Sequence, residues 1–257
     1  MSTFGPLLQR LLAHPLTRDL NIDSAQTTEL RRKIISAKPF LKSIYVDWYK
    51  LLANHVPESP EPALELGSGA GFFKGYVPRL ITSEVLRCSE IDVVLDGQML
   101  PFADSSLRAI VMTDVLHHIS DCKAFFREAE RCLTCRGRLV MLEPWVTWWS
   151  RFVYTFLHHE PFHPDSQDWG FPAGGALSGA NGAIPWIVFD RDRKSFEEEF
   201  GHLTVTKVMP MMPFRYLVSG GISMRAMMPS FLYPVWRAID RLFPGAAMFA
   251  FIVVEKK

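Results

Sequence analysis

Three glycines at alternate positions, in the stretch ALELGSGAGFF at residues 63–73, could bring the backbone against a nucleotide. Glycine carries no side chain, so it allows a tight turn and a close approach to a ligand. The usual dinucleotide loop has a further glycine five positions after its first, where this chain has Phe72. The loop at residues 67–71 therefore predicts a nucleotide-type site, but it fits a nicotinamide or flavin site poorly.

Acidic residues follow at the points where strands should end. Glu65 comes just before the glycine loop, Glu84 lies in ITSEV, and Asp96 lies in LDGQ. Carboxylates at the carboxyl ends of parallel strands can accept hydrogen bonds from a ribose. Glu90 and Asp92 compete with Glu84 for that role, but they lie near the start of the next strand, where we expect a structural or solvated position. An aspartate followed by glycine is also a common turn, which is the alternative for Asp96.

A third group of residues could act on a substrate. Thr113 and Asp114 end a predicted strand, and the sequence VLHHI follows them with His117 and His118. Histidine titrates near neutral pH, so either ring could remove a proton from an acceptor. Either ring could equally pack in the core or cap the next helix, and both alternatives stay open.

Two clusters raise the question of metal binding. Cys132 and Cys135 form a C-x-x-C, but no second pair exists to complete a zinc site, so we expect reduced thiols without a special role. The stretch LHHEPFHPD places several metal-ligand types within eight residues. It matches no two-histidine helix signature, and its prolines disfavour a helix. We therefore expect acceptor contacts or a surface loop there, and no metal. The residues are His158, His159, Glu160, His163 and Asp165.

The hydrophobic pattern predicts an α/β domain that would position these groups. Apolar residues spaced three and four apart indicate helices at 27–37 and 39–56, and the proline-rich VPESPEP separates this helical cap, 1–56, from a domain at 63–257. Residues 145–190 are rich in aromatics, proline and glycine and read as an irregular insertion. Strands are predicted at 62–66, 80–85, 91–96, 107–115, 137–144, 203–210 and 249–257, and helices at 72–80, 121–133 and 194–200.

Composition excludes some classes of protein. The 257 residues include 28 basic and 27 acidic side chains, so no overall charge attracts nucleic acid. No signal-peptide pattern opens the chain, and the longest apolar run, AAMFAFIVV, is about half the length of a membrane helix. We expect a cytoplasmic protein. Methionines and aromatics in the last third favour a lipophilic ligand and leave room for a peripheral contact with membrane or lipid.

Taken together, LELGSGAG, the stretch from SEIDVVLD to VLHHI, and CRGRLVMLEPW resemble the class I S-adenosylmethionine-dependent methyltransferases, in particular the branch of the ubiquinone and menaquinone C-methyltransferases. The resemblance covers about Ala63 to Pro144. It implies a Rossmann-like, mostly parallel seven-stranded sheet with an antiparallel last strand. It also implies S-adenosyl-L-methionine as cofactor, bound by Glu65, Gly67, Ser68, Gly69, Gly71, Glu84, Asp96, Gly97 and Thr113, with Asp114, His117 and His118 at the catalytic edge.

Three functions fit this pattern. The first is methyl transfer to a small acceptor that is lipophilic or linked to a glycan, and the second is cofactor binding without catalysis, for regulation or contact with a partner. The third, a nicotinamide-dependent oxidoreductase, fits less well because of Phe72. For the first function we expect the cap and the insertion at 145–190 to close over the methyl donor as a lid. Its lining would come from Tyr45 or Trp48 on one side and from Trp145, Trp148 or Trp149 on the other.

Overall fold

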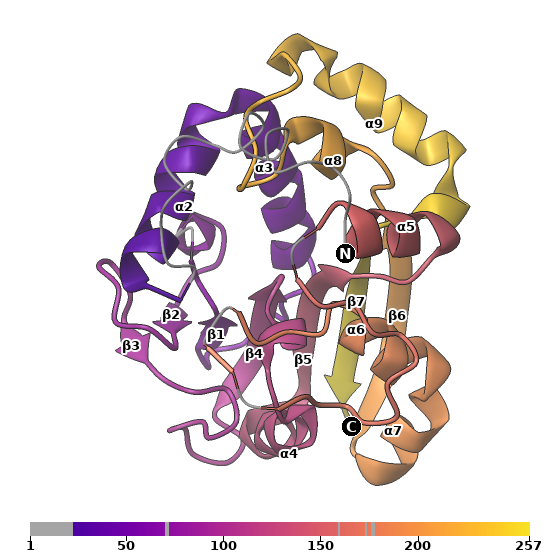
Figure 1. Cartoon of the computed structure of the whole chain (residues 1–257). Helices are drawn as coiled ribbons and strands as arrows, with labels where there is room; N and C mark the ends of the chain where they lie inside the picture. Colours follow the sequence, from indigo (N-terminus) through magenta and orange to yellow (C-terminus); the bar gives the residue numbers. More distant parts are fainter. Residues whose placement is uncertain (1–22, 70–71, 159, 173, 176–177) are drawn as a thin grey trace.

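A seven-stranded sheet forms the centre of the protein, in the order β3-β2-β1-β4-β5-β7-β6 (Figure 1). The structure, a computed structural model, describes residues 23–69, 72–158, 160–172, 174–175 and 178–257. β7 runs antiparallel to both of its neighbours, and the pairs from β3 to β5 are parallel, which confirms the predicted sheet. The strands are β1 (Ala63–Leu66), β2 (Leu80–Glu84), β3 (Val93–Val94), β4 (Leu107–Thr113), β5 (Leu133–Pro144), β6 (Leu203–Met211) and β7 (Phe249–Lys256).

Helices cover both faces of the sheet, which explains why the central strands are almost continuously apolar. On one face lie α4 (Cys122–Cys132), α6 (Ile184–Trp186), the π-helical η3 (Ile187–Arg191) and α7 (Arg193–Glu199), with a core that includes Phe125, Phe126 and Phe196. α3 (Pro39–Ala53) covers the other face. Asp121 caps α4 by accepting from the Ala124 N–H, close to the predicted start of this helix.

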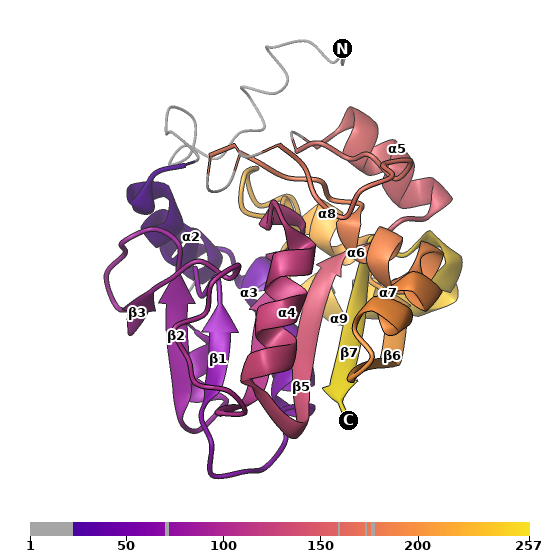
Figure 2. The same cartoon turned by 90° about the horizontal axis from the view of Figure 1, so that it is seen from below.

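The N-terminal helices share the core of the sheet. α2 (Ala25–Ala37) begins after Ser24, whose side chain accepts from the Thr27 N–H. On α3, Trp48 is fully buried; its ring stacks on Tyr216 and packs against Phe249 of β7. Figure 2 shows β1 and β2 pointing towards the level at which α2 lies, so this helix stands near the carboxyl ends of the strands.

The insertion after β5 is more regular than we expected. It contains α5 (Trp148–Phe156), which begins at a capping box between Thr147 and Ser150. α5 buries Val153 and Tyr154 but exposes Trp148, so aromatic residues lie on its exposed side as well as on its buried side. After β6 follow α8 (Arg215–Ser219), the 3-10 turn η4 (Ser230–Leu232), α9 (Tyr233–Leu242) and the 3-10 turn η5 (Pro244–Ala246).

One predicted helix is much shorter in the structure. The helix expected over residues 72–80 is a single 3-10 turn, η1 (Phe73–Gly75), because Gly75 and Pro78 leave no room for further helical hydrogen bonds. A second 3-10 turn, η2 (Leu116–His118), follows β4 and carries the paired histidines.

Candidate active site

The glycine loop begins directly after β1. Gly67 has a φ of +67°, and a side chain there would place its Cβ 2.5 Å from Val115 Cγ2. Gly69 has a φ of +29°, and its N–H donates to Glu84 Oε1 over 2.8 Å. Glycine adopts such backbone angles without strain. The end of β1 therefore needs glycine for its turn, and the loop is held against the end of β2. Gly71, the last predicted residue of the loop, lies outside the described residues.

Glu65 of β1 is a buried carboxyl group without a full set of partners. It is 3% exposed, and burial raises its pKa from the usual 4.5 to about 8. Its Oε2 has no hydrogen-bond partner among the described atoms. A buried polar atom of this kind is expensive unless a ligand or water satisfies it. A ligand ammonium group would fit, because it would both donate to this oxygen and favour the ionised carboxylate.

Glu84 and Ser68 have different tasks at the neighbouring strand ends. Burial raises the pKa of Glu84, which ends β2, although the hydrogen bond from the Gly69 N–H lowers it in part. The Ser68 N–H donates to the Ser83 carbonyl over 2.8 Å, and the Ser83 N–H donates to Ser68 Oγ over 3.0 Å. Ser68 thus ties β1 to β2, while Glu84 faces the cavity described below.

Asp96 and Gly97 lie just beyond β3. Asp96 Oδ1 accepts from the backbone N–H of Gln98 over 2.9 Å and from its side-chain amide over 3.1 Å. A Cβ at Gly97 would lie 2.8 Å from Leu66 Cδ2. Because Gly97 has no side chain, the backbone can pack closely against Leu66 there. The hydrogen bonds to Gln98 form a local turn that positions the Asp96 carboxylate.

The two competing acids have structural positions, as we expected. Asp92 accepts from the Thr82 N–H and hydroxyl, both over 2.9 Å, and from Lys74 Nζ over 2.7 Å. These hydrogen bonds, that of Lys74 first, lower its pKa to about 2. Glu90 forms an exposed ion pair with Arg32. Neither residue lines the cavity at the strand ends.

A cavity of about 240 Å³ lies at the carboxyl ends of β1, β2 and β4. Most of the predicted cofactor residues meet there, together with Asp114 and His118 of the predicted catalytic group. Glu65, Ser68, Gly69 and His117 are not part of its lining. Arg31 of α2 and Phe171 also line this cavity, and the sequence analysis missed both. The predicted residues in the lining are Gly67, Glu84, Asp96, Gly97, Thr113, Asp114 and His118.

Glu143, at the end of β5, organises the turn that follows β4. It is fully buried, and its Oε1 accepts from the Val115 and Leu116 N–H groups, each over 2.8 Å. Its Oε2 lies 2.9 Å from His117 Nδ1. Asp114 begins the turn with a φ of +64°, which is unusual for a residue other than glycine. Glu143 was not predicted, although it lies at a strand end like the acids that were.

The charges around the histidines are closely coupled. Burial lowers the pKa of His117, but the carboxylates of Glu143 and Glu160 outweigh this effect, and the pKa lies well above its usual value. Burial and the positive charge of His117 lower the pKa of His118 to about 3. Burial raises the pKa of Asp114 to about 6. Burial alone would raise the pKa of Glu160. The hydrogen bond from His117 and its positive charge outweigh burial, so this pKa lies below its usual value.

A second cavity, of about 380 Å³, adjoins the first. Arg31, Asp114 and His118 line both cavities, so these side chains stand at their junction. The walls of the second cavity come from α2, α5, the segment around Glu160, α8 with the residues after it, and the start of β7. They are mainly apolar, apart from the junction and a few further polar groups. The apolar and aromatic residues are Pro144, Val153, Tyr154, Leu157, Tyr216, Leu217, Ile222, Met224, Met248 and Phe249.

The five aromatic residues that we expected in this lining lie elsewhere. Tyr45, Trp48 and Trp145 are buried in the two cores, and Trp148 is exposed. Trp149 donates from Nε1 to a backbone carbonyl, 3.0 Å away, and does not line the cavity. The aromatic walls come instead from Tyr154, Tyr216 and Phe249, which the periodicity of the segments did not single out.

The C-x-x-C pair has no partner for special chemistry among the described residues. Cys132 is buried at the end of α4, Cys135 is exposed in β5, and both are free thiols. No described helix combines the length and the apolar character needed to cross a membrane.

Comparisons with known proteins show which proteins this chain resembles. Residues 64–141 match the protein family described as "Methyltransferase domain". The demethylmenaquinone methyltransferase of Thermotoga maritima is 32% identical over an alignment of 113 residues, which covers 37% of this chain and 49% of that protein. The chain thus matches about half the length of this curated relative.

Solved structures share the fold. A geranyl diphosphate C-methyltransferase from Streptomyces coelicolor, crystallised with Mg²⁺, geranyl diphosphate and S-adenosyl-L-homocysteine, has a TM-score of 0.51 at 14% identity, covering 89% of this chain and 84% of that chain. A structure of a Haloferax volcanii methyltransferase activator in complex with a methyltransferase gives a TM-score of 0.53 at 11% identity, covering 92% and 98%. The core of this protein at residues 64–141 is thus similar to a methyltransferase domain, and the chain shares the fold of these methyltransferases.

Proposed function

We propose that this chain transfers a methyl group from S-adenosylmethionine to a small acceptor with an apolar body. One observation carries the proposal: a cavity at the strand ends and a larger, mainly apolar cavity meet at Arg31, Asp114 and His118. A methyl donor and an acceptor need such an arrangement, because the two reacting atoms must be held close together and in line.

The residues of the first cavity have the chemistry to hold the cofactor. The backbone at Gly67 leaves room for its amino acid part, and the orphan oxygen of Glu65 suits its ammonium group. Glu84 would accept from the ribose hydroxyls, and Asp96 would accept from the adenine amino group. Gly97 keeps space open for the ring. When bound, the cofactor supplies a methyl group that its sulfonium sulfur has already activated.

At the junction, Asp114 and His118 face the place where transfer would occur. The bond from sulfur to the methyl carbon breaks as the bond from that carbon to the acceptor forms. Where the acceptor loses a proton, the Asp114 carboxylate is the group that we propose takes it, since it lines both cavities. His117 is fully buried and does not line either cavity, so we assign it a positioning role.

The walls of the second cavity support a lipophilic acceptor. Val153 and Tyr154 of α5, and Leu157 just after it, line the cavity together with Leu217 and Met224 from the segment that contains α8. Such walls bind an apolar body and exclude water from the transfer. α2 and α5 both contribute to them, which supports the proposal that the N-terminal helices and the insertion act as a lid over the methyl donor.

An apolar surface next to this cavity supports a contact with lipid. The same helix α5 exposes Trp148, Phe152 and Phe156, spaced four residues apart, while α9 and its flanks expose further apolar side chains. Phe214 packs against Trp149 on one side and against Phe243 on the other, so it connects the two regions. α9 also carries Arg237 and Arg241, which suit anionic headgroups. The exposed residues at α9 are Phe231, Val235, Leu242 and Phe243. We propose that the acceptor enters from a lipid surface at this face.

Binding calorimetry tests the proposed cofactor. We expect S-adenosylmethionine to bind one site per chain and NAD not to bind; the reverse result would favour an oxidoreductase. Transfer of a labelled methyl group to a lipid extract then tests catalysis. Tight cofactor binding without transfer to any acceptor, by parent and by Asp114→Asn alike, would favour a non-catalytic binding protein.

Sedimentation with vesicles tests the lipid contact. With vesicles that contain phosphatidylglycerol, we expect the parent to sediment, and a Trp148→Asp and Phe231→Asp double variant to stay in solution. Met99→Asp is the control, because Met99 is equally exposed but lies after β3. Equal sedimentation of the double variant and the control would contradict the proposed surface.

A further inference from the structure

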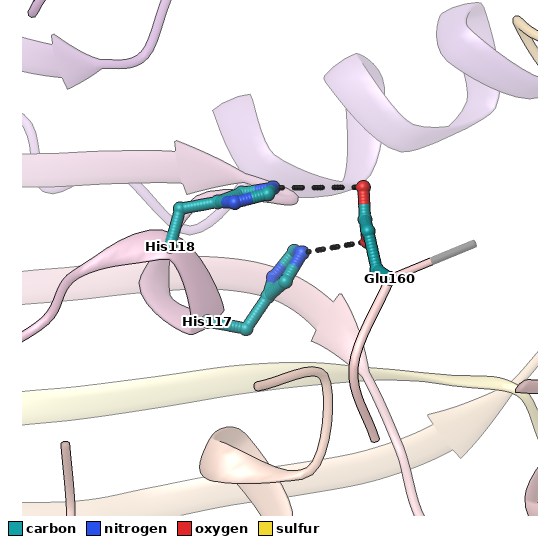
Figure 3. Close-up of side chains that lie close together, drawn as sticks. All are labelled: His117, His118 and Glu160. Carbon is teal, nitrogen blue, oxygen red and sulfur yellow. Dashed lines mark ion pairs between the residues drawn. The ribbon is translucent and has the colours of Figure 1, made fainter. Parts of the chain in front are cut away.

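Two imidazoles and a carboxylate converge beside the junction of the cavities (Figure 3). His117 and His118 come from η2, and Glu160 comes from the segment after α5. His117 Nε2 lies 3.5 Å from Glu160 Oε2, and His118 Nε2 lies 3.9 Å from Glu160 Oε1. One ligand atom from each residue lies within 4.8 Å of the other two. Three ligands at about 2.1 Å from a tetrahedral ion are about 3.4 Å apart, so small movements would suit an ion.

A hydrogen bond at Nδ1 fixes each ring so that its Nε2 is directed at Glu160. His117 Nδ1 faces Glu143 Oε2. Two backbone N–H groups donate to the other oxygen of Glu143, as suits an ionised carboxylate, which can only accept, so His117 Nδ1 is the donor. His118 Nδ1 lies 3.1 Å from the Gly179 carbonyl, which can only accept. In each ring Nδ1 therefore carries a proton, and Nε2 is directed at Glu160. Metal-binding histidines show this arrangement, in which a carboxylate or carbonyl accepts from the other ring nitrogen.

The surroundings favour a cation. Three carboxylates, those of Asp114, Glu143 and Glu160, lie within 4 Å of the His117 ring nitrogens. His117 Nε2 is fully buried and has no hydrogen-bond partner in the described part of the chain. Glu143 is fully buried and Glu160 largely so, and negative charge in such surroundings is costly unless a cation balances it. A proton on His117 offers one positive charge, and a divalent ion in its place offers two.

We propose that His117, His118 and Glu160 bind a divalent transition-metal ion of the Zn²⁺ type, with Asp114 beside it. Two imidazoles and one carboxylate suit Zn²⁺ and its first-row neighbours better than Mg²⁺ or Ca²⁺, which prefer oxygen ligands alone. We expected no metal from the sequence, because the stretch around Glu160 matches no two-histidine helix signature. The paired histidines lie far from Glu160 along the chain, and only the fold joins them.

The site is placed to act on the acceptor. His118 and Glu160 both line the second cavity, so an open position on the ion would face the acceptor. There the ion would bind an acceptor oxygen and ease the loss of its proton. This role rests on the proposed function, whereas metal binding itself does not.

Metal titration of chelator-treated protein tests the site. We expect calorimetry with Zn²⁺ alone to give one ion per chain, and Co²⁺ to give the visible absorption of a tetrahedral site with nitrogen and oxygen ligands. Glu160→Gln and His118→Gln should weaken Zn²⁺ binding at least about a hundredfold, since a ligand matters more than its supporting groups, whose loss costs 10–100-fold. His163→Gln, an exposed histidine of the same segment, is the control and should bind as the parent does.

Binding of S-adenosylhomocysteine to the same samples separates the possible failures. If the parent takes up no Zn²⁺, or if both ligand variants bind it as tightly as the control, the metal site is wrong even where the cofactor binds. If Zn²⁺ binds at these residues but the cofactor does not, the proposed function fails and the metal site stands. A variant that fails to fold leaves the stoichiometry and the Co²⁺ spectrum of the parent as the deciding results.

Discussion

Replacing Glu65 by glutamine should stabilise the cofactor-free protein and weaken its cofactor site. The pKa of Glu65 rises from 4.5 to about 8 on folding, because burial penalises the ionised form. Between these values the carboxyl group is protonated in the folded chain and ionised in the unfolded chain, so the free energy of unfolding falls as pH rises. The fall is about 1.4 kcal/mol per pH unit, or up to about 3 kcal/mol at pH 7. Glutamine cannot ionise, so the variant does not lose this free energy of unfolding as the pH rises.

Urea unfolding at several pH values measures the effect. The parent and Glu65→Gln should be equally stable near pH 4, and the variant should gain over the parent up to about pH 8. Calorimetry should show the opposite order for S-adenosylmethionine, with affinity reduced about tenfold to a hundredfold, because the variant loses a charged hydrogen bond of about 1.5–3 kcal/mol. Stability curves that run parallel at all pH values, or unchanged cofactor affinity, would refute the reasoning on Glu65.

Three further substitutions test separate parts of the structure. Gly67→Ala should abolish cofactor binding, because its Cβ would meet Val115 at 2.5 Å and its φ is positive; calorimetry that shows parent-like affinity would place the site elsewhere. Glu84→Ala should weaken the cofactor affinity about tenfold to a hundredfold, whereas Glu90→Ala, at the surface, should leave it unchanged; a loss in the second variant alone would contradict the assignment. Asp240→Ala should lower the free energy of unfolding by about 1.5–3 kcal/mol, because the buried Arg215 loses its ion pair with Asp240 and keeps only Asp47, at 3.4 Å, as an acidic partner; an unchanged urea midpoint would show that this pair contributes little.

The elements that the sequence predicts well are those with one clear apolar pattern. The sheet follows from short apolar runs separated by turns, and α3 follows from apolar residues along one side, from Leu41 to Leu52. α5 escaped prediction because Trp148 and Phe152 face outward while Val153 and Tyr154 face the protein. Because its outward-facing residues include aromatics like those it buries, the sequence does not show which side of α5 faces the core.

The same distinction holds for the candidate site. Gly67, Glu84 and Asp96 could be placed because each lies at or just after the end of a strand, and the carboxyl ends of parallel strands meet at one edge. Arg31 and Glu160 carry no local signal of this kind. α2 and the segment after α5 bring them to the junction, so only tertiary packing shows that they belong there.

A crystal structure with S-adenosylhomocysteine is the most direct test of the central claim, that donor and acceptor meet where the two cavities join. The account predicts the ribose on Glu84, the ammonium group near Glu65, and the sulfur at the junction lined by Arg31, Asp114 and His118, open towards the apolar cavity. A sulfur atom that lies away from these three residues, or that faces bulk solvent on the side away from α5, would contradict the account.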